Sequence, residues 1–458
     1  MLRSKAKPIS IRVSPGAYFG VLLFASFLTA FLLYLGLEIS AAVVFVGAWL
    51  IVPVLAFCDP IVFDGRRLRR TGLAFRLVSR AFGVRDRLKL SDVEQVDSQT
   101  IRTIKRGGRV TYRYRTSFHG KGVVFSIISG GEAYRRLVRA VLPNLSGDTM
   151  DARSIELRDY LAEPDEVLRK AQRSRIPPSD VLENSLADLH PRRSNAAAPK
   201  LRDDSEADPT EIEDLRRLGN ELRLTGSLLR AIEAFRRALL LAPRDAWLLY
   251  DLARCLLSYS GAERDERLER RAVAMIRLAE RRAGGDGELL ARIGESYFQI
   301  GDWRRAASVF KTAIGAVGES FRSLRGLAEI ALREGKIAHV IHNFAAANRL
   351  ADTSSLRRWT LAEMEYFSRL NEDDEYMELE VSRVNLLDTL DRVRRSALRF
   401  VLLGLPVIAA GLLLEDSLIA NIGWGVSIFA LCIWICVVAG KQMLQRRIPF
   451  EIVDADRR

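Results

Sequence analysis

Two histidines and two cysteines are the residues of this chain whose spacing could support chemistry. His339 and His342 lie three positions apart in a helical pattern and could share a metal ion, but no nearby carboxylate or cysteine completes a set of ligands. Cys432 and Cys436 are one helical turn apart in an apolar run, which favours packing. The sequence has no phosphate-binding loop, dinucleotide-binding glycine pattern, nucleophile elbow or zinc-protease motif. We therefore expect no enzymatic activity, no metal and no cofactor.

A dense group of basic residues occupies residues 64–121. Sixteen Lys and Arg stand there against five Asp and Glu, so this segment accounts for most of the net charge of +13 of the 458-residue chain. Near a bilayer, each such residue is worth about 1 kcal/mol of attraction to anionic headgroups. The candidate residues for binding lipid or another anion are Arg66, Arg67, Arg69, Arg70, Arg109, Arg113 and Arg115. The alternative is a solvated basic surface with no specific ligand.

Period-two patterns predict strands within residues 60–145. Along residues 109–115, valine and tyrosine alternate with arginine and threonine, and residues 122–128 alternate in the same way. The tyrosines lie on the face opposite the arginines and form no stacking platform, so we do not expect nucleic acid as a partner. After residue 131 the apolar residues follow a helical period, which ends at Pro143.

Strands closed by one amphipathic helix, directly after an apolar hairpin, resemble the bacterial pleckstrin-homology-like (PH-like) membrane proteins. The residues that carry this resemblance are Arg87–Val96, the strand pair at 109–128 and the helix at 131–142. The resemblance implies a small β-rich PH-like domain over residues 60–145. It does not bring phosphoinositide binding with it.

Uncharged apolar runs at both ends of the chain predict two transmembrane helical hairpins. The first covers residues 17–58, where two runs long enough to span a bilayer meet at Glu38. The second covers residues 396–440 and turns at Glu415 and Asp416. Its first run, 400–414, is short and spans only if residues 396–399 join the helix. The alternative is a hairpin that is only partly embedded.

Positive charge predicts the orientation of both hairpins. Basic residues flank all four apolar runs on their outer sides, and neither joining loop contains Lys or Arg. By the positive-inside rule, residues 1–16 form a basic cytoplasmic N-terminus and residues 441–458 a cytoplasmic tail. The segment between the hairpins is then cytoplasmic as well. No cysteine spacing suggests a disulfide or a zinc site, which agrees with a reducing compartment. The expected location is the cytoplasmic (inner) membrane.

The composition of residues 146–210 predicts a linker that is partly disordered. Polar residues, Pro177-Pro178 and an acidic stretch at 203–208 interrupt any apolar period, above all after residue 185. A short helix around 155–171, broken or started at Pro164, is compatible with the pattern.

Residues 211–392 repeat a pattern of small and large apolar residues about every 34 positions. In the first copy Gly219, Gly226, Ala231 and Phe235 hold the spacing at which Gly294, Gly301, Ala306 and Phe310 stand in a later copy. A degenerate copy between them carries an insertion near residues 261–267. This spacing resembles that of tetratricopeptide repeat (TPR) proteins, which implies an all-α TPR solenoid of paired helices.

The TPR resemblance implies that the first helix of each repeat lines the inner face of the solenoid. The candidate residues for binding a partner protein there are Arg216, Asn220, Arg223, Trp247, Tyr250, Arg254, Phe298, Arg322 and Arg325. Leu215–Asn220 resembles half of the carboxylate clamp of chaperone-binding repeat proteins, but Asp251 and Glu295 depart from that pattern and would repel a carboxylate. Trp247 and Tyr250 are candidate hot spots, and the alternative is that both pack against a neighbouring repeat.

The sequence therefore predicts a multidomain membrane protein with two transmembrane hairpins, a β-rich PH-like domain and a TPR solenoid. We expect a membrane-anchored scaffold whose solenoid binds an unidentified protein near the membrane. The alternative is a module that responds to anionic membrane lipids through the basic domain, with the repeats mediating homo-oligomer assembly.

Overall fold

The computed structural model describes residues 8–13, 16–73, 75–76, 80, 85–104, 110–129, 131–182, 208–263, 265–444 and 447. The chain forms two compact units. One contains the described residues of 1–13 and 59–364, and the other contains those of 14–58 and 365–458. Each unit is built from segments that are far apart in the sequence.

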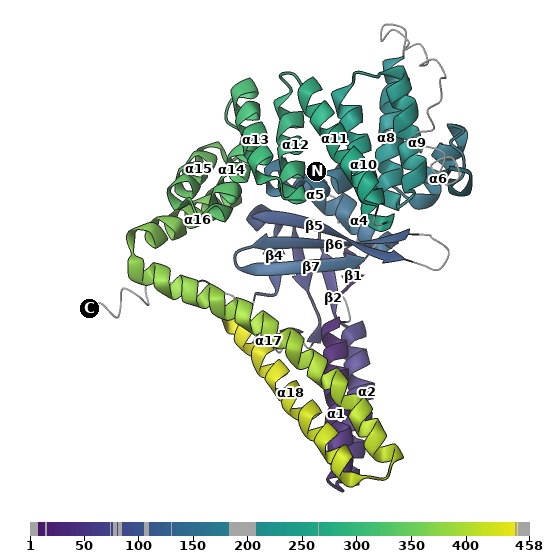
Figure 1. The fold of residues 1–458 in the computed structure, drawn as a ribbon, viewed down its shortest axis with the longest axis vertical. Helices are drawn as coiled ribbons and strands as arrows, with labels where there is room; N and C mark the ends of the chain where they lie inside the picture. The colour runs from purple at the N-terminus through teal and green to yellow at the C-terminus, as the bar shows by residue number, and fades with distance from the viewer. Residues whose placement is uncertain are drawn as a thin grey trace, which may run out of the picture. The chain divides into compact units, whose positions relative to one another are not determined.

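Two antiparallel sheets begin the first unit (Figure 1). The four-stranded sheet has the order β1 (Ile9–Arg12), β2 (Pro60–Phe63), β3 (Arg67–Arg70) and β4 (Arg87–Lys89). The short 3-10 helix η1 (Leu90–Asp92) leads to the three-stranded sheet of β5 (Gln95–Ile104), β6 (Val110–Gly120) and β7 (Val123–Ser129). Helix α4 (Glu132–Val141) follows and buries its apolar face in the core that both sheets share. The strands predicted over 109–128 and the helix predicted over 131–142 are therefore present.

Strand β1 corrects the prediction for the N-terminus. Residues 1–16 were expected to be a basic cytoplasmic segment, but Ile9–Arg12 pairs with Phe63–Pro60 and buries Ile11 in the sheet core. The sequence signal was weak because the strand has four residues and its partner follows only after the apolar hairpin. The β-domain thus begins before residue 17 and not at residue 60.

Residues 146–182 differ from the predicted linker. After the 3-10 helices η2 (Leu142–Asn144) and η3 (Gly147–Thr149), the chain forms α5 (Ala152–Tyr160) and α6 (Pro164–Arg173). Asp151 caps α5, and Ile155 and Leu157 join the core of the sheets. Val167 and Ala171 of α6 pack into the start of the helical region. The stretch is polar in sequence because α5 is buried through hydrogen bonds and ion pairs as well as through apolar contacts. Residues 183–207, where disorder was predicted, lie outside the described residues.

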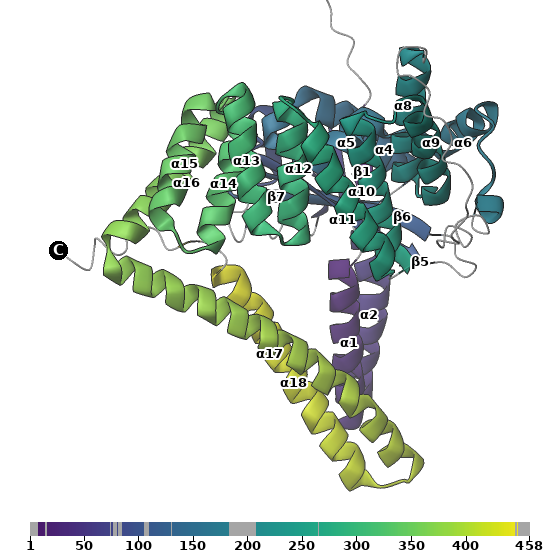
Figure 2. The same ribbon diagram turned by 45° about the horizontal axis from the view of Figure 1, so that its top comes forward.

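Stacked antiparallel helix pairs form the rest of the first unit, as the repeat spacing predicts, and the last helix belongs to this unit only up to Met364. The helices are α8 (Pro209–Thr225), α9 (Leu228–Leu241), α10 (Ala246–Glu263), α11 (Glu266–Arg282), α12 (Gly287–Ile300), α13 (Trp303–Val317), α14 (Phe321–Arg333), α15 (Ile337–Leu350) and α16 (Ser354–Glu372). Figure 2 shows them side by side as a TPR-like solenoid.

The small residues of the repeat lie where paired helices touch. A Cβ atom at Gly219 would stand 2.7 Å from Phe235, and one at Gly294 would stand 2.8 Å from Phe310. Glycine is required at these positions because the aromatic ring of the second helix occupies the space of a side chain on the first. Gly226 and Gly301 end α8 and α12 in the left-handed conformation, with φ of 89° and 92°.

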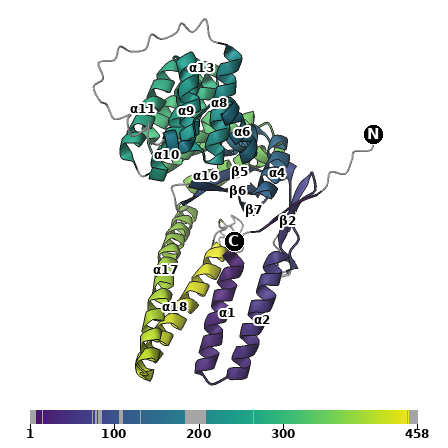
Figure 3. The ribbon, with the colours of Figure 1, turned by 90° about the vertical axis from the view of Figure 1, so that its right-hand side faces the viewer.

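The second unit contains the end of α16, from Glu365, and two helical hairpins (Figure 3). These are α1 (Gly16–Tyr34) with α2 (Glu38–Phe57), and α17 (Asp374–Leu413) with α18 (Ser417–Leu444). In the described part of the chain, three helices are long and apolar enough to cross a membrane, within Glu38–Phe57, Asp374–Leu413 and Ser417–Lys441. The apolar stretch of the fourth, Tyr18–Tyr34, is shorter.

The two hairpins contact each other near their turns. Tyr34 hydrogen-bonds to Asn421 and stacks on Trp424 with ring centroids 6.5 Å apart. Both turns therefore lie at the same end of the unit. Helix α17 is continuous through residues 396–399, so its apolar part is longer than the short run that the sequence suggested. The sequence suggested that the solenoid ends at residue 392 and the second hairpin begins at residue 396. Helix α17 runs through both positions without a break.

Candidate functional site

The inner face of the first two helix pairs is occupied by helix α5. Glu156 of α5 is 3% exposed and forms ion pairs with Arg223 of α8, at 2.9 Å, and with Arg254 of α10. Both arginines are also buried, at 7% and 8% exposed. Burial, together with the charges of nearby arginines, lowers the pKa of Arg254 to about 9. Arg254 therefore remains cationic at neutral pH and holds the carboxylate of α5 inside the solenoid.

A second buried cluster continues this polar contact. Asp251 of α10 accepts hydrogen bonds from Arg216 Nε at 2.8 Å and from Asn220 Nδ2 at 3.1 Å. Arg223 donates to the Asn220 side-chain oxygen at 3.1 Å. Asp251, which was expected to repel a carboxylate ligand, is thus neutralised by Arg216 and also accepts a hydrogen bond from Asn220.

Trp247 and Tyr250 pack against neighbouring helices. Trp247 Nε1 donates to Asp286 at 2.8 Å, and the guanidinium groups of Arg216 and Arg292 lie 4.9 and 5.1 Å from its ring centre. Tyr250 is 1% exposed and its hydroxyl lies 3.1 Å from Ser296 Oγ. Both residues therefore pack against the following repeat, which was the alternative to their being exposed hot spots.

Helix α5 also joins the solenoid to the sheets. Ser154 Oγ donates to Ser98 Oγ of β5 at 2.8 Å, and the backbone of Asp151 donates to the Val96 carbonyl. On the other side Tyr114 of β6 donates to the carbonyl of Leu224 at the end of α8. The β-domain and the solenoid are therefore held together by polar contacts that pass through α5 and beside it.

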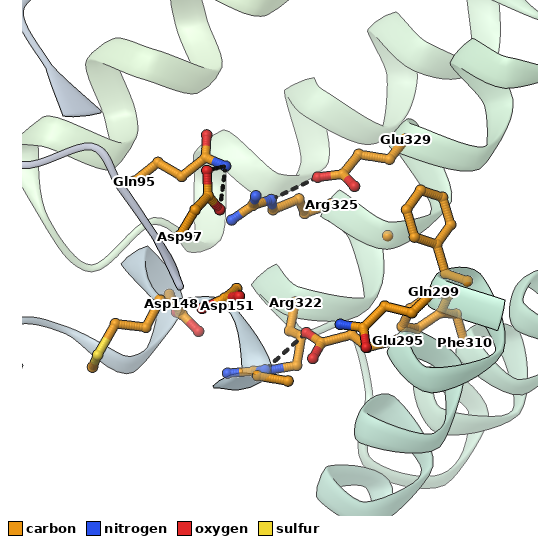
Figure 4. Close-up of a pocket in the computed structure, with 14 residues that line it drawn as sticks. Gln95, Asp97, Asp148, Asp151, Glu295, Gln299, Phe310, Arg322, Arg325 and Glu329 are labelled. Carbon is orange, nitrogen blue, oxygen red and sulfur yellow. Dashed lines mark hydrogen bonds and ion pairs between the residues drawn. The ribbon is translucent and has the colours of Figure 1, made fainter. Parts of the chain in front are cut away.

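A pocket of about 270 Å³ opens on the inner face further along the solenoid (Figure 4). Its walls come from the start of β5, from the turn before α5 and from α12, α13 and α14. The lining residues are Gln95, Asp97, Asp148, Met150, Asp151, Ala152, Glu295, Phe298, Gln299, Phe310, Arg322, Arg325, Gly326 and Glu329. Three of the nine predicted partner-binding residues, Phe298, Arg322 and Arg325, are therefore brought together here.

Carboxylates outnumber cations around this pocket. Arg322 pairs with Glu295 at 2.8 Å and Arg325 with Glu329 at 2.9 Å, as Figure 4 shows. Burial, together with the charge of Asp352, raises the pKa of Asp148. Burial likewise raises the pKa of Asp151, although hydrogen bonds from Ser154 oppose it. The pocket is thus suited to a group that brings positive charge and some apolar surface.

Sequence reasoning placed Glu295 on the inner face but missed Asp148 and Asp151. These two come from the segment predicted to be a linker. An aspartate at position 151, followed by Ile155 and Leu157, is a usable signal for a capped helix. No signal in the sequence showed that this helix would enter the solenoid.

The predicted anion-binding arginines are divided between the two sheets. Arg67 and Arg69 of β3 are exposed and stand opposite Lys89 and Arg87 of β4. Arg66 is exposed in the turn before them, whereas Arg70 is hydrogen-bonded to buried Asp59. Arg113 and Arg115 are exposed on β6 of the other sheet, and Arg109 lies outside the described residues.

No group of three or more His, Cys, Asp or Glu suited to a metal ion occurs among the described residues. His339 and His342 both lie on α15. Cys432 and Cys436 lie on α18.

Comparisons with known proteins give likenesses to TPR structures. No family model matches the chain, and no curated protein matches it. The alignment with the structure of TTC0263, a thermophilic TPR protein in Thermus thermophilus, covers 34% of this chain and 83% of the TTC0263 chain. The sequence identity is 20% and the TM-score is 0.30. MamA covers 31% of this chain and 78% of its own, at 19% identity and a TM-score of 0.25. The Cut9–Hcn1 structure covers 69% of this chain and 55% of its own, at 12% identity and a TM-score of 0.29.

Proposed function

We propose that this protein is a membrane-anchored scaffold whose solenoid binds a partner protein close to the membrane surface. The hairpins lie in the cytoplasmic membrane, and the β-domain, the solenoid and both chain ends face the cytoplasm. The proposal combines the anchor, the orientation and the binding surface, and each has its own support.

Contacts across the ends of each hairpin support the orientation. Strand β1, before the first hairpin, pairs with β2, after it. Asp391, before the apolar part of α17, holds Lys441 of α18 at 2.7 Å. Two segments that touch lie on the same side of a membrane, so each hairpin crosses it an even number of times. The basic flanks then assign that side to the cytoplasm.

The pocket on the inner face is the observation that carries the binding function. The inner face of α8 and α10 is filled by α5, whereas the face of α12 and α14 keeps a pocket of about 270 Å³. Phe298 offers apolar surface there, and Asp148 and Asp151 offer carboxylates. A partner segment with a basic and an apolar side chain fits this chemistry.

Site-specific photo-crosslinking in cells tests the binding function. A photo-crosslinking amino acid at Gln299 should capture a discrete partner, and the same group at exposed Lys311 of α13 serves as the control. The Gln299 adduct should disappear when Glu329→Lys is added. Equal adducts at both positions, or an adduct unaffected by Glu329→Lys, would remove the pocket as the binding surface.

A second candidate function, recognition of anionic lipid, is favoured by the pairing of like charges on β3 and β4. Arg67 faces Lys89 and Arg69 faces Arg87, an arrangement that costs stability unless an anion lies nearby. Asp64 and Asp86 partly offset these charges. The four-stranded and three-stranded sheets closed by α4 also support the PH-like resemblance.

Vesicle binding tests this second function on the full-length protein, because β1 and the solenoid contacts belong to the domain. Protein in neutral nanodiscs should float with vesicles that contain anionic lipid, and Arg69→Glu/Arg87→Glu should abolish flotation. The control, Arg136→Glu/Arg169→Glu, changes charge equally on α4 and α6. Binding of one lipid that survives about 0.5 M salt would identify a specific ligand, since salt screens general attraction. Self-association stays a separate prediction, which mass measurement of the nanodisc-free protein in detergent can check.

A further inference from the structure

Helix α5 occupies the inner face of the solenoid in the way that a bound peptide would. It is nine residues long, and its Ala152, Ser154, Ile155, Glu156 and Leu157 are buried. Glu156 reaches Arg223 and Arg254, which lie on two different repeats. Both arginines were predicted to bind a partner because of their positions in the repeats. The chain's own helix therefore shows which chemistry this surface recognises.

The buried ion pairs of this contact are not fully hydrogen-bonded. Two guanidinium groups face the Glu156 carboxylate, and Arg223 Nε and Glu156 Oε2 both lack a hydrogen-bond partner among the described residues. The other acid of the cluster, Asp251, is already bound by Arg216 and Asn220. A helix whose carboxylate reaches both buried guanidinium groups is therefore the ligand that this face recognises.

The same short segment forms one wall of the open pocket. Asp148, Asp151 and Ala152 line it, and the Gly147 carbonyl accepts a hydrogen bond of 3.5 Å from Arg322. Movement of α5 would therefore remove a wall of the pocket and release the contact between Ser154 and β5. The segment that contains α5 therefore fills the inner face, lines the pocket and holds the β-domain.

We propose that α5 is an internal ligand that closes the inner face of α8 and α10, and that a partner protein opens it by presenting a helix with a carboxylate to Arg223 and Arg254. The proposal rests on the proposed function, because it names the partner's chemistry and the step that regulates access. A helix of another protein is the proposed occupant, and binding of the helix from a second copy of this chain is an outcome that the experiment detects.

A fluorescent peptide of residues 146–163, which contains α5, is the probe. Full-length protein with Glu156→Lys, in detergent, should bind this peptide, because reversed charge repels the internal helix from both arginines. The wild-type protein should bind it at least about a hundredfold more weakly, the scale of a lost buried charge pair. A peptide that itself carries Glu156→Lys should not bind. Glu213→Lys, an exposed change on α8, is the matched control and should behave as wild type.

Hydrogen exchange of the wild-type protein provides a test that does not depend on any variant folding. Amides of α5 should exchange at least about a hundredfold faster than those of α12, through opening of α5 alone. If α5 exchanges only with global unfolding, or if folded Glu156→Lys protein leaves the peptide unbound, α5 is a fixed structural helix and the proposal is wrong.

Two further results separate the possible failures. Binding of the peptide to wild-type protein at high peptide concentration, with displacement of α5 seen by exchange, identifies a second copy as a competent source of the helix. An intact crosslink at Gln299 with no peptide binding overturns the internal ligand alone. Peptide binding with no crosslink at Gln299 overturns the pocket as the binding surface and leaves the internal ligand in place.

Discussion

Arg70 donates through Nε to both carboxylate oxygens of Asp59 at 3.0 Å, immediately after the chain leaves α2. Asp59 is fully buried, and a Cβ atom at Gly72 would stand 2.2 Å from its Oδ1. The backbone carbonyl of Asp59 also accepts a hydrogen bond from Val13 at the end of β1. This pair therefore fixes the ends of β1 and β2 at which the chain enters and leaves the apolar hairpin.

Replacing Arg70 should loosen the sheet at these strand ends. Arg70→Gln removes the Arg70 cation from the buried Asp59 carboxylate, which costs about 3 kcal/mol. Hydrogen exchange of β1 and β2 amides in the full-length protein should accelerate by about a hundredfold in consequence. Arg67→Gln removes an exposed pair with Asp64 and should leave these amides unchanged. Equal effects of the two changes would contradict a special role for Asp59.

Two glycine substitutions should act in opposite directions. Gly294→Ala places a methyl group 2.8 Å from the Phe310 ring, and such overpacking costs about 1–3 kcal/mol. Gly315→Ala lies in α13 with no atom within 4 Å of the new Cβ, and alanine in a helix gains about 0.5–1 kcal/mol over glycine. Thermal melting of the helical signal should therefore fall for the first variant and rise for the second. A lower midpoint for both would mean that the solenoid does not pack as described.

Asp148→Asn should stabilise the protein at neutral pH. Burial, followed by repulsion from Asp352, raises the pKa of Asp148 above its ordinary 3.8. An acid whose pKa is raised by folding contributes full stability below the ordinary pKa and loses it as the pH rises through the folded value. The asparagine variant has no charge to bury, so its gain should be present at pH 7–8 and shrink as the pH falls towards 4. Thermal melting across this range measures it.

The control for this pH dependence is Asp214→Asn, at an exposed position on α8. Its melting temperature should stay close to that of the wild type and should show no gain that shrinks as the pH falls. A gain from Asp148→Asn that is equal at pH 4 and pH 8 would show that a change in shape, and not removal of the charge, causes it.

The contact between the hairpins predicts a specific crosslink. In a variant whose four native cysteines are replaced by serine, Tyr34→Cys and Asn421→Cys should be joined by a short bifunctional thiol reagent, which spans the space that the tyrosine ring leaves. Tyr34→Cys paired with Val407→Cys is the control, because residue 407 lies within α17. A shift in gel mobility after cleavage of the chain between the hairpins reports the crosslink. Its absence would mean that the turns are not neighbours.

The repeats and the apolar hairpins were the features most accessible to sequence reasoning. The close approach of Gly219 to Phe235 and of Gly294 to Phe310 requires small residues at fixed spacing, and that spacing is visible in a single sequence. Long uncharged runs are equally direct, because length and composition alone make a helix able to cross a bilayer.

Elements stabilised by distant polar partners could not be found in this way. Glu156 looks like a residue of a solvated linker until Arg223 and Arg254 are placed beside it, 67 and 98 positions later. Strand β1 has only four residues, and nothing local distinguishes it from a basic terminal segment. For the same reason the inner face looked open in the sequence, although two of its repeats are filled by the chain itself.

The pairing of β1 with β2 gives this protein a fixed order of assembly. During synthesis β1 leaves the ribosome first and has no partner until both helices of the hairpin and then Pro60–Phe63 have followed. Under the proposed membrane anchoring, a hairpin with one crossing would leave these strands on opposite faces of the bilayer, with the edge of β2 unpaired. Closure of the sheet would then depend on correct insertion, and only a properly inserted chain would complete the β-domain that contacts α5.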